Sequence, residues 1–309
     1  GLYGWNSFVG HYIMFSSLTI AAECALLLSG DFGYLELLRS QIRILMDNAI
    51  TREDLQRFQQ TYYNAGNAVI ALVGAVDRQR AEQTASILSE LGEGRAVAYR
   101  CDVGSEKQMA TLADKAESLL GRPMTLVVNN AGVGVGGRIG EVPLGDWRWC
   151  LKVNLWGVIH GCHFFAPKLR ALGYGGIVNV ASAAGFGAAP EMSAYNVTKS
   201  AVLSLSETLA AELTGTGVHV SALCPTVVPT NILDKARLPE HRGDFAHAAM
   251  RKWTFATSDQ VARRTLDALD RKQLYVVPQF DGRFMWRFKR YAPRLYARAL
   301  GEAYRLAGG

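Results

Sequence analysis

The 309-residue sequence has few cysteines and no obvious metal-binding spacing. It contains five cysteines, an odd number, mostly within apolar runs and with no C-x-x-C motif. Disulfide-stapled domains and Cys-based zinc sites need paired cysteines, so neither is expected. His160 and His163 lie three apart in the sequence, but no third ligand at zinc-like spacing accompanies them, and we interpret them as core or interface residues. We therefore predict reduced, buried thiols, no metal site and a cytoplasmic protein.

Long hydrophobic runs and strong charge are also lacking. The apolar stretch from Tyr12 to Leu28 has 17 residues and contains Glu23, whereas a membrane-spanning helix needs about 20 apolar residues. No basic segment precedes it, so a signal peptide is not supported. The formal charge of +6 is modest and the basic excess lies near the C-terminus, which argues against a nucleic-acid partner. With 49% hydrophobic residues, the chain can still bury a sizeable core.

What the sequence does contain is a stretch from Ile177 to Leu203 that reads as a buried strand followed by a helix. Ser182 stands where the strand ends, and Tyr195 and Lys199 stand one helical turn apart. A tyrosine hydroxyl has a pKa of about 10 in water, and a nearby ammonium group is expected to lower it. A serine hydroxyl beside it can hold a carbonyl or alcohol oxygen while the proton moves. The stretch therefore predicts a proton-transfer site.

Two further motifs accompany this stretch. Residues 126–132 read as an apolar strand that ends in Asn-Asn-Ala-Gly, and residues 146–169 read as an apolar helix that contains Asn154. Together with Ser182 and Tyr195-x-x-x-Lys199, these motifs resemble the short-chain dehydrogenase/reductase family over about residues 65–280. A lone Asn in an apolar helix is usually a structural amide, but in this family it kinks the helix and holds a water that connects the lysine to solvent.

The resemblance implies an NAD(P)-dependent oxidoreductase that moves a hydride between nicotinamide and an alcohol or ketone, with an expected lipophilic substrate. The candidate catalytic residues are Asn154, Ser182, Tyr195 and Lys199. Ser182 would polarise the substrate oxygen and Tyr195 would exchange the proton. Lys199 would lower the tyrosine pKa and hold the nicotinamide ribose, while Asn154 would complete the relay. A non-catalytic binding or scaffold protein of the same fold is the alternative.

The first turn of the cofactor site departs from the family pattern, Thr-Gly-x-x-x-Gly-x-Gly. This chain offers Ser29-Gly30-Asp31-Phe32-Gly33, which is one residue shorter and lacks the last glycine. Asp31 would repel a phosphate that approaches this turn. An ordinary strand-to-helix turn without a ligand is therefore an equally good interpretation of this segment.

The remaining cofactor positions follow from the resemblance. Arg78 lies just beyond the second strand, where a basic residue favours the 2′-phosphate of NADP, so the sequence leans to NADP over NAD. The alternative is that Arg78 is an ordinary solvent-exposed charge at the start of a helix and contacts no cofactor. The candidate cofactor-binding residues are Gly30, Gly33, Arg78, Asp102, Val103, Asn130, Ala131, Gly132, Tyr195, Lys199, Pro225, Val228 and Thr230.

Buried strands that alternate with amphipathic helices predict an α/β, Rossmann-like doubly wound parallel sheet with helical N- and C-terminal additions. We divide the chain into an atypical N-terminal segment (1–64), a catalytic domain (65–280) and a basic aromatic C-terminal segment (281–309). Strands are expected at 95–103, 218–226 and 273–278, and a helix capped by Ser258 precedes the last of them. The wide apolar surfaces of helices 146–169 and 195–213 predict a homodimer or homotetramer.

The C-terminal segment carries seven Arg and Lys residues interleaved with aromatics on either side of Pro293. One interpretation is a pair of helices whose aromatic face packs on the protein body or on a partner subunit, with Arg stems covering apolar surface. The other is a peripheral membrane-surface element that brings the active site to lipophilic substrates.

Overall fold

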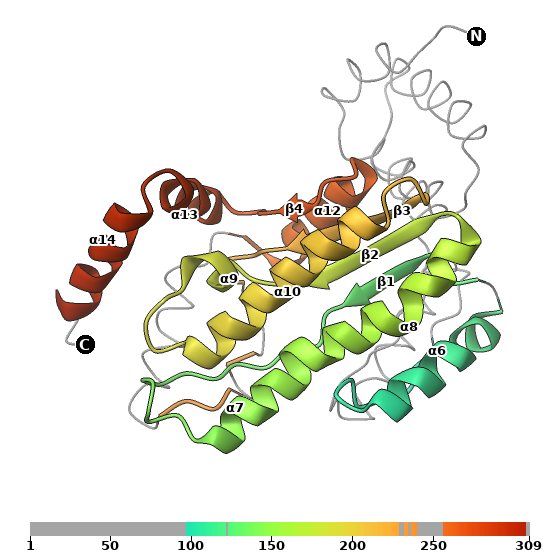
Figure 1. Ribbon diagram of the computed structural model, residues 1–309, viewed down its shortest axis with the longest axis horizontal. Helices are drawn as coiled ribbons and strands as arrows, with labels where there is room; N and C mark the ends of the chain where they lie inside the picture. Colours follow the sequence, from blue (N-terminus) through green and yellow to red (C-terminus); the bar gives the residue numbers. More distant parts are fainter. Residues whose placement is uncertain (1–96, 122, 229–231, 234–235, 240–255, 307–309) are drawn as a thin grey trace, which may run out of the picture.

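The computed structural model of the protein describes residues 97–121, 123–228, 232–233, 236–239 and 256–306. None of the helices in these ranges is long and apolar enough to cross a membrane. In chain order the elements are α6 (Glu106–Leu120), β1 (Leu126–Asn129), α7 (Leu144–Leu151), η1 (Lys152–Trp156), α8 (Gly157–Leu172), β2 (Gly175–Val180), α9 (Ala184–Gly187), α10 (Ser193–Glu212), β3 (Val218–Leu223), α12 (Ser258–Asp270), β4 (Tyr275–Val276), α13 (Phe280–Tyr291) and α14 (Pro293–Leu306) (Figure 1).

The four described strands form one parallel sheet in the order β1-β2-β3-β4. Val127 of β1 pairs with Ile177 of β2, which in turn pairs with Val220 of β3. Parallel neighbours need long crossover connections, and helices supply each of them. The α/β class and the parallel sheet that the sequence predicts are confirmed.

Helices cover both faces of this sheet, as successive residues of β2 show. Ile177 packs into the larger core with Leu169 of α8 and Val202 of α10. Its neighbour Val178 points to the opposite face and packs with Val261 of α12. Each fully buried aliphatic side chain contributes about 1.5–3 kcal/mol, so a continuous apolar run in β2 stabilises both layers at once.

A chain of polar side chains crosses the larger core and ties three elements together. Asn129 of β1 donates a hydrogen bond to Oδ1 of Asn179 in β2 (2.8 Å), and Asn179 donates to Oγ of Ser206 in α10 (3.0 Å). Gly161 of α8 makes room for the first amide, because a Cβ there would lie 1.9 Å from Asn129 Oδ1. The hydrogen bonds compensate for the burial of these polar groups and fix the register of strands and helix.

Some local predictions are wrong. The described part of the expected strand at 95–103, residues 97–103, is not a strand and pairs with none of the four described strands. It leads into a turn in which Ser105 N donates to Asp102 O at 2.9 Å, just before α6. The cap of α12 is Thr257 rather than Ser258, since the Thr257 hydroxyl accepts from Gln260 N. Gly30, Gly33 and Arg78 lie outside the described residues, as does the whole N-terminal segment 1–64. The domain division therefore stays a prediction.

Candidate functional site

The carboxyl ends of three parallel strands bring the predicted site residues to one edge of the sheet. Ser182 follows β2, and Pro225 follows β3. The Ser182 hydroxyl donates to Pro225 O at 3.4 Å and accepts from Ala184 N at 3.1 Å. The backbone of the next residue, Ala183, also donates to Pro225 O at 2.9 Å. These bonds hold the serine between the two strand ends.

Helix α10 carries Tyr195 and Lys199, as predicted. Tyr195 is partly buried, whereas Lys199 is only 2% exposed. The Lys199 ammonium donates to Val180 O at 2.7 Å and lies 5.6 Å from the centroid of the Tyr195 ring. The lysine is therefore anchored to the end of β2 while its charge remains close to the tyrosine.

Asn154 lies in the π-helical turn η1, between α7 and α8, and is fully buried. Its Oδ1 accepts from Val133 N at 2.8 Å and its Nδ2 donates to Val133 O at 2.9 Å. A Cβ on Gly132 would lie 3.6 Å from both Asn154 Oδ1 and Lys199 Nζ, so the end of β1, the π turn and α10 meet here. Such π turns are frequent at functional sites, and this one explains the kink expected at Asn154.

Burial dominates the electrostatics of the pair on α10. It lowers the pKa of Lys199 to about 8. It raises the pKa of Tyr195, and the neighbouring Ser182 hydroxyl opposes that rise. The sequence leads us to expect that Lys199 lowers the tyrosine pKa; in this structure desolvation of the phenolate is the largest influence and the pKa is raised. Tyr195 consequently keeps its proton at neutral pH.

Asp102 and Val103, two of the candidate cofactor-binding residues, are fixed by helix α8 and the π turn. The Asp102 carboxylate accepts from Lys152 Nζ (2.7 Å) and Gly104 N (2.9 Å), and the Lys152 hydrogen bond is the main reason why the pKa of Asp102 is lowered. Val103 is buried, and its carbonyl lies 2.7 Å from His160 Nδ1. These contacts join the 102–104 turn to the start of η1.

The two histidines considered for a metal have separate environments. His160 is buried against Val103 O, whereas His163 is exposed and stacks edge-on against Phe164 at a centroid distance of 4.9 Å. In the described ranges no cluster of three His, Cys, Asp or Glu residues has a metal-binding arrangement.

Of the remaining cofactor candidates, Asn130 and Gly132 are exposed just beyond β1, and Ala131 is partly buried there.

The loop after β3 is fixed by two residues that the sequence did not single out. Gln279 is almost fully buried; its Oε1 accepts from Thr226 N at 3.2 Å and its Nε2 donates to Val227 O at 3.3 Å. The Thr226 hydroxyl donates to Asp281 Oδ1 at 3.2 Å. Val228 packs in the smaller core, and Thr230 lies outside the described residues. Thr226 was the available clue in the sequence, because a hydroxyl beside a buried strand end needs a hydrogen-bond partner.

The loop that joins Ser182 to Tyr195, residues 183–192, has a strained backbone. Ala188 and Glu191 adopt positive φ angles of 55° and 59°, in the left-handed region that non-glycine residues seldom occupy. Gly185 lets this loop approach α10, because a Cβ there would lie 2.8 Å from Lys199 O. The loop is therefore held close to the backbone of the lysine.

The C-terminal helices keep this loop in place. Lys289 of α13 donates to Phe186 O at 2.6 Å, and Tyr296 of α14 donates to Gly187 O at 2.7 Å. Tyr304 donates to Glu191 Oε1 at 2.7 Å. The C-terminal segment is thus attached to the chain between the candidate serine and tyrosine, a connection that sequence patterns could not reveal.

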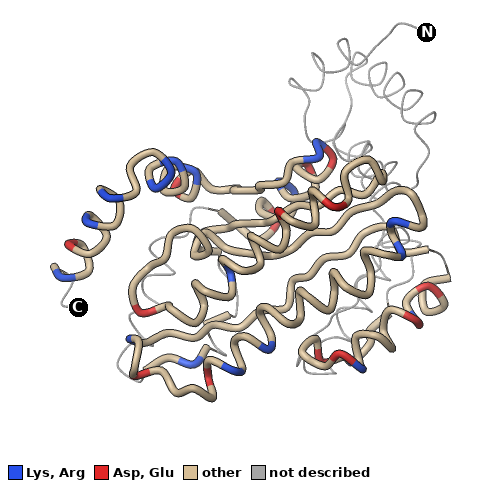
Figure 2. The backbone as a smooth tube through the Cα atoms, in the orientation of Figure 1, with Lys and Arg blue, Asp and Glu red and all other residues tan. Residues whose placement is uncertain are grey.

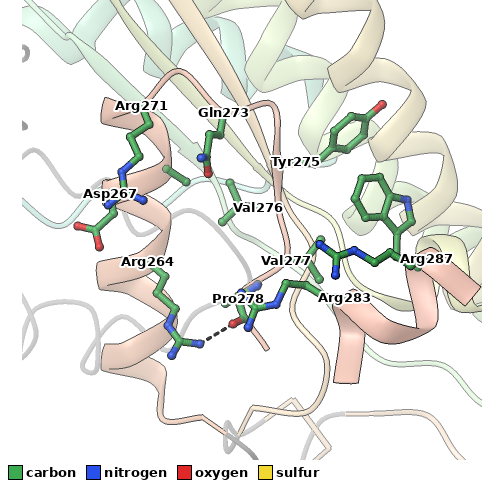
Figure 3. A pocket seen from close by; sticks show the side chains of 12 residues that line it. Arg264, Asp267, Arg271, Gln273, Tyr275, Val276, Val277, Pro278, Arg283 and Arg287 are labelled. Carbon is green, nitrogen blue, oxygen red and sulfur yellow. Dashed lines mark hydrogen bonds between the residues drawn. The ribbon is translucent and has the colours of Figure 1, made fainter. Parts of the chain in front are cut away.

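A separate cavity of about 370 Å³ lies between α12, β4 and α13 (Figure 3). Four arginines line it, with Asp267 and two aromatic side chains. None of the candidate catalytic residues contributes to its lining. The arginines are Arg264, Arg271, Arg283 and Arg287.

Comparison with known proteins identifies the family. The model of the family described as short chain dehydrogenase matches residues 56–241, and the chain belongs to this family. The match begins after Gly30 and Gly33, so it does not cover the proposed pyrophosphate turn. A solved short-chain dehydrogenase/reductase from Burkholderia phymatum, in complex with NAD, is 33% identical with a TM-score of 0.65, and the match covers 73% of this chain and 85% of that one. The predicted Rossmann-like fold is confirmed by this likeness.

Two curated relatives show how far the similarity extends. "Probable oxidoreductase EphD" of Mycobacterium bovis is 36% identical over 163 residues, which is 52% of this chain and 27% of that protein. This chain therefore matches only about a quarter of the length of EphD. "D-threitol dehydrogenase" of Mycolicibacterium smegmatis is 34% identical over 194 residues, covering 62% of this chain and 74% of that enzyme.

Proposed function

We propose that the protein is an NAD(P)-dependent oxidoreductase that interconverts an alcohol and a ketone. The observation that carries this proposal is the convergence of Asn154, Ser182, Tyr195 and Lys199 at the carboxyl edge of a parallel sheet. The family membership supports it, and so do relatives such as the D-threitol dehydrogenase, whose name states an alcohol oxidation.

In this proposal the protein's own groups orient the substrate and move one proton. The Ser182 hydroxyl, held between the ends of β2 and β3, turns its one proton from Pro225 O, a long contact of 3.4 Å, to the substrate oxygen. Tyr195 gives its proton to the ketone oxygen as the carbon accepts a hydride, and takes the proton back in the oxidation direction. The nicotinamide cofactor supplies or accepts that hydride when it is bound.

The residues beside Tyr195 fit a nicotinamide ribose. An ammonium has three N–H donors, and the buried Lys199 directs one of them to Val180 O. Its other donors suit ribose hydroxyls that enter past the exposed Gly132. Val133 holds Asn154 through hydrogen bonds of 2.8 and 2.9 Å. Asn154 Oδ1 and Lys199 Nζ each lie 3.6 Å from the position that a Cβ on Gly132 would take, so a water bound beside both groups can return protons to the lysine. Asn154 thereby serves as a positioning residue for the relay.

The cofactor is NAD or NADP, and we propose a preference for NADP. Arg78, just beyond the predicted second strand, supports that preference, because a guanidinium binds a 2′-phosphate bidentately. The solved relative from Burkholderia phymatum holds NAD, and a more distant neighbour of the same fold holds NADPH. Fluorescence titration of the pure protein with NADPH and with NADH tests the preference; Arg78→Ala should weaken NADPH binding and leave NADH binding unchanged.

A non-catalytic scaffold is the second candidate, and one observation favours it. The turn at Gly30 and Gly33 is shorter than the family pattern and includes Asp31, so its backbone offers fewer donors to a pyrophosphate. The same titration separates the two functions. Binding of neither nucleotide at millimolar concentration would leave the scaffold as the better account.

The proposed substrate is a lipophilic alcohol or ketone, and the proposed assembly is a homodimer or homotetramer. Two large apolar side chains support the assembly: Trp156 of η1 is 52% exposed and Val197 of α10 is 48% exposed. Both belong to the helices expected to pair across a two-fold axis. Light scattering of the wild type and of Val197→Glu measures the contribution of this surface.

A further inference from the structure

Helices α13 and α14 present apolar side chains to solvent although both are attached to the protein body. In α14 no residue is buried, and in α13 only Gly282 is buried. The exposed side chains are large, and most surfaces of this kind mark a partner. They are Phe280 (62% exposed), Phe284 (70%), Tyr291 (85%), Leu295 (59%) and Leu306 (78%).

These side chains remain exposed even though the opposite sides of the helices are already packed. Met285 and Trp286 of α13 pack on the larger core. Tyr296 and Tyr304 of α14 donate their hydroxyl protons to the 183–192 loop. Packing on the body therefore occupies one side of each helix, and the outward apolar side chains need another explanation.

The segment that carries this outward surface is also strongly basic. Residues 280–306 contain seven Arg and Lys residues against two acidic ones, a net charge of +5 in a chain whose total is +6. Figure 2 shows these cationic residues following one another along the two C-terminal helices. Arg290, Arg294 and Arg298 are exposed, and Arg290 lies 6.0 Å from the Trp286 ring.

We propose that the α13–α14 surface, residues 280–306, docks on an anionic lipid bilayer. A helix with aromatic and aliphatic side chains on one side and arginines beside them lies at the boundary between headgroups and acyl chains. The aromatic rings enter that boundary while long arginine side chains reach the phosphates. A second copy of the chain is a poor occupant, because two segments of net charge +5, each with Arg290, Arg294 and Arg298 exposed, repel each other.

Docking would have a consequence for the candidate active site, and this step rests on the proposed function. The α13–α14 surface is bonded to the 183–192 loop through Lys289, Tyr296 and Tyr304. That loop lies between Ser182 and Tyr195. A bilayer held by the two helices would therefore lie close to the segment that bounds the substrate, which suits alcohols and ketones dissolved in lipid.

Sedimentation of the full chain with vesicles tests the docking without any turnover. Vesicles of phosphatidylcholine with 30% phosphatidylglycerol should bind the wild type, and pure phosphatidylcholine vesicles should bind it far more weakly. The double variant Arg294→Gln/Arg298→Gln should lose about 30-fold in binding, since each basic side chain near an anionic surface contributes a factor of about five. The matched control Lys107→Gln/Lys115→Gln removes two exposed charges from α6 and should bind as the wild type does.

The apolar contribution is tested separately. Phe284→Ser/Tyr291→Ser should lower binding at least tenfold and should leave the circular dichroism spectrum and the unfolding midpoint unchanged. Three results would overturn the proposal: absence of sedimentation with anionic vesicles, equal binding to neutral vesicles, or equal losses in the α6 control. Self-association that Phe284→Ser/Tyr291→Ser abolishes, without lipid binding, would assign the surface to a second copy instead. None of these readouts depends on whether the protein is an enzyme.

Discussion

Replacing Lys199 by methionine should stabilise the cofactor-free protein at neutral pH, although it should abolish activity. The lysine is buried, and burial lowers its pKa from 10.5 to about 8. Below pH 8 both the folded and the unfolded chain carry the charge, so the folded state bears the whole cost of burying it. A shift of this size corresponds to about 3.4 kcal/mol.

The sign with pH follows from proton binding. Between pH 8 and 10.5 the unfolded chain binds more protons at this position than the folded chain, so the wild type gains stability as the pH rises. From pH 7 to pH 10 the wild type should gain about 2.5 kcal/mol relative to Lys199→Met. Loss of the bond to Val180 O costs the variant about 1 kcal/mol at every pH, so its advantage at pH 7 should be about 2 kcal/mol.

Urea unfolding of the wild type and Lys199→Met at pH 7 and pH 10 measures this difference. Lys107→Met, at an exposed position, is the control and should show no pH-dependent difference. Burial also raises the pKa of the neighbouring Cys224 thiol to about 12 and raises that of Cys150, so these groups titrate later. A stability difference between wild type and Lys199→Met that stays constant from pH 7 to pH 10 would refute the reasoning.

Three further predictions concern pH, packing and the cofactor turn. Because burial raises the pKa of Tyr195, alcohol oxidation, which needs the phenolate as base, should accelerate steadily from pH 7 to pH 10 in initial-rate assays, whereas ketone reduction should not. Gly161→Ala should destabilise the fold by about 1–3 kcal/mol in urea unfolding, because its Cβ would clash with the Asn129 amide, whereas Gly301→Ala, with open space around it, should be neutral or stabilising. Asp31→Gly should tighten NADPH binding in fluorescence titration if this turn holds the pyrophosphate; tight binding that the substitution leaves unchanged would place the phosphates elsewhere.

Motifs with short, fixed spacing could be predicted from the sequence. The strand–helix unit around Ser182 and Lys199 follows from local periodicity. The structure brings these two residues close to Asn154 at the carboxyl edge of the sheet. Residues 97–103 were predicted as a strand because the segment resembles the third strand of the family, but a resemblance in sequence does not fix the pairing of each segment. The hydrogen bonds of Gln279 and Thr226 join positions 52 to 55 residues apart, so no local pattern contains them.

The direction of the tyrosine pKa shift was also beyond sequence reasoning. A lysine one turn away predicts a lowered pKa, yet the result depends on how deeply both groups are buried and on what the ammonium contacts. In the structure Lys199 donates to Val180 O, and burial of Tyr195 is the largest influence on its pKa. Side-chain burial of this kind is set by tertiary packing and not by spacing along one helix.

The central claim is that Tyr195 transfers the proton, and the turnover of Tyr195→Phe tests it most directly. Phenylalanine keeps the ring but removes the hydroxyl, so folding and NADPH binding should remain close to those of the wild type. Steady-state reduction of a ketone that the wild type accepts should fall by about two to four orders of magnitude, the usual contribution of a general acid. If Tyr195→Phe retains more than about a tenth of the wild-type kcat/KM, a loss far smaller than a general acid contributes, Tyr195 is not the proton donor.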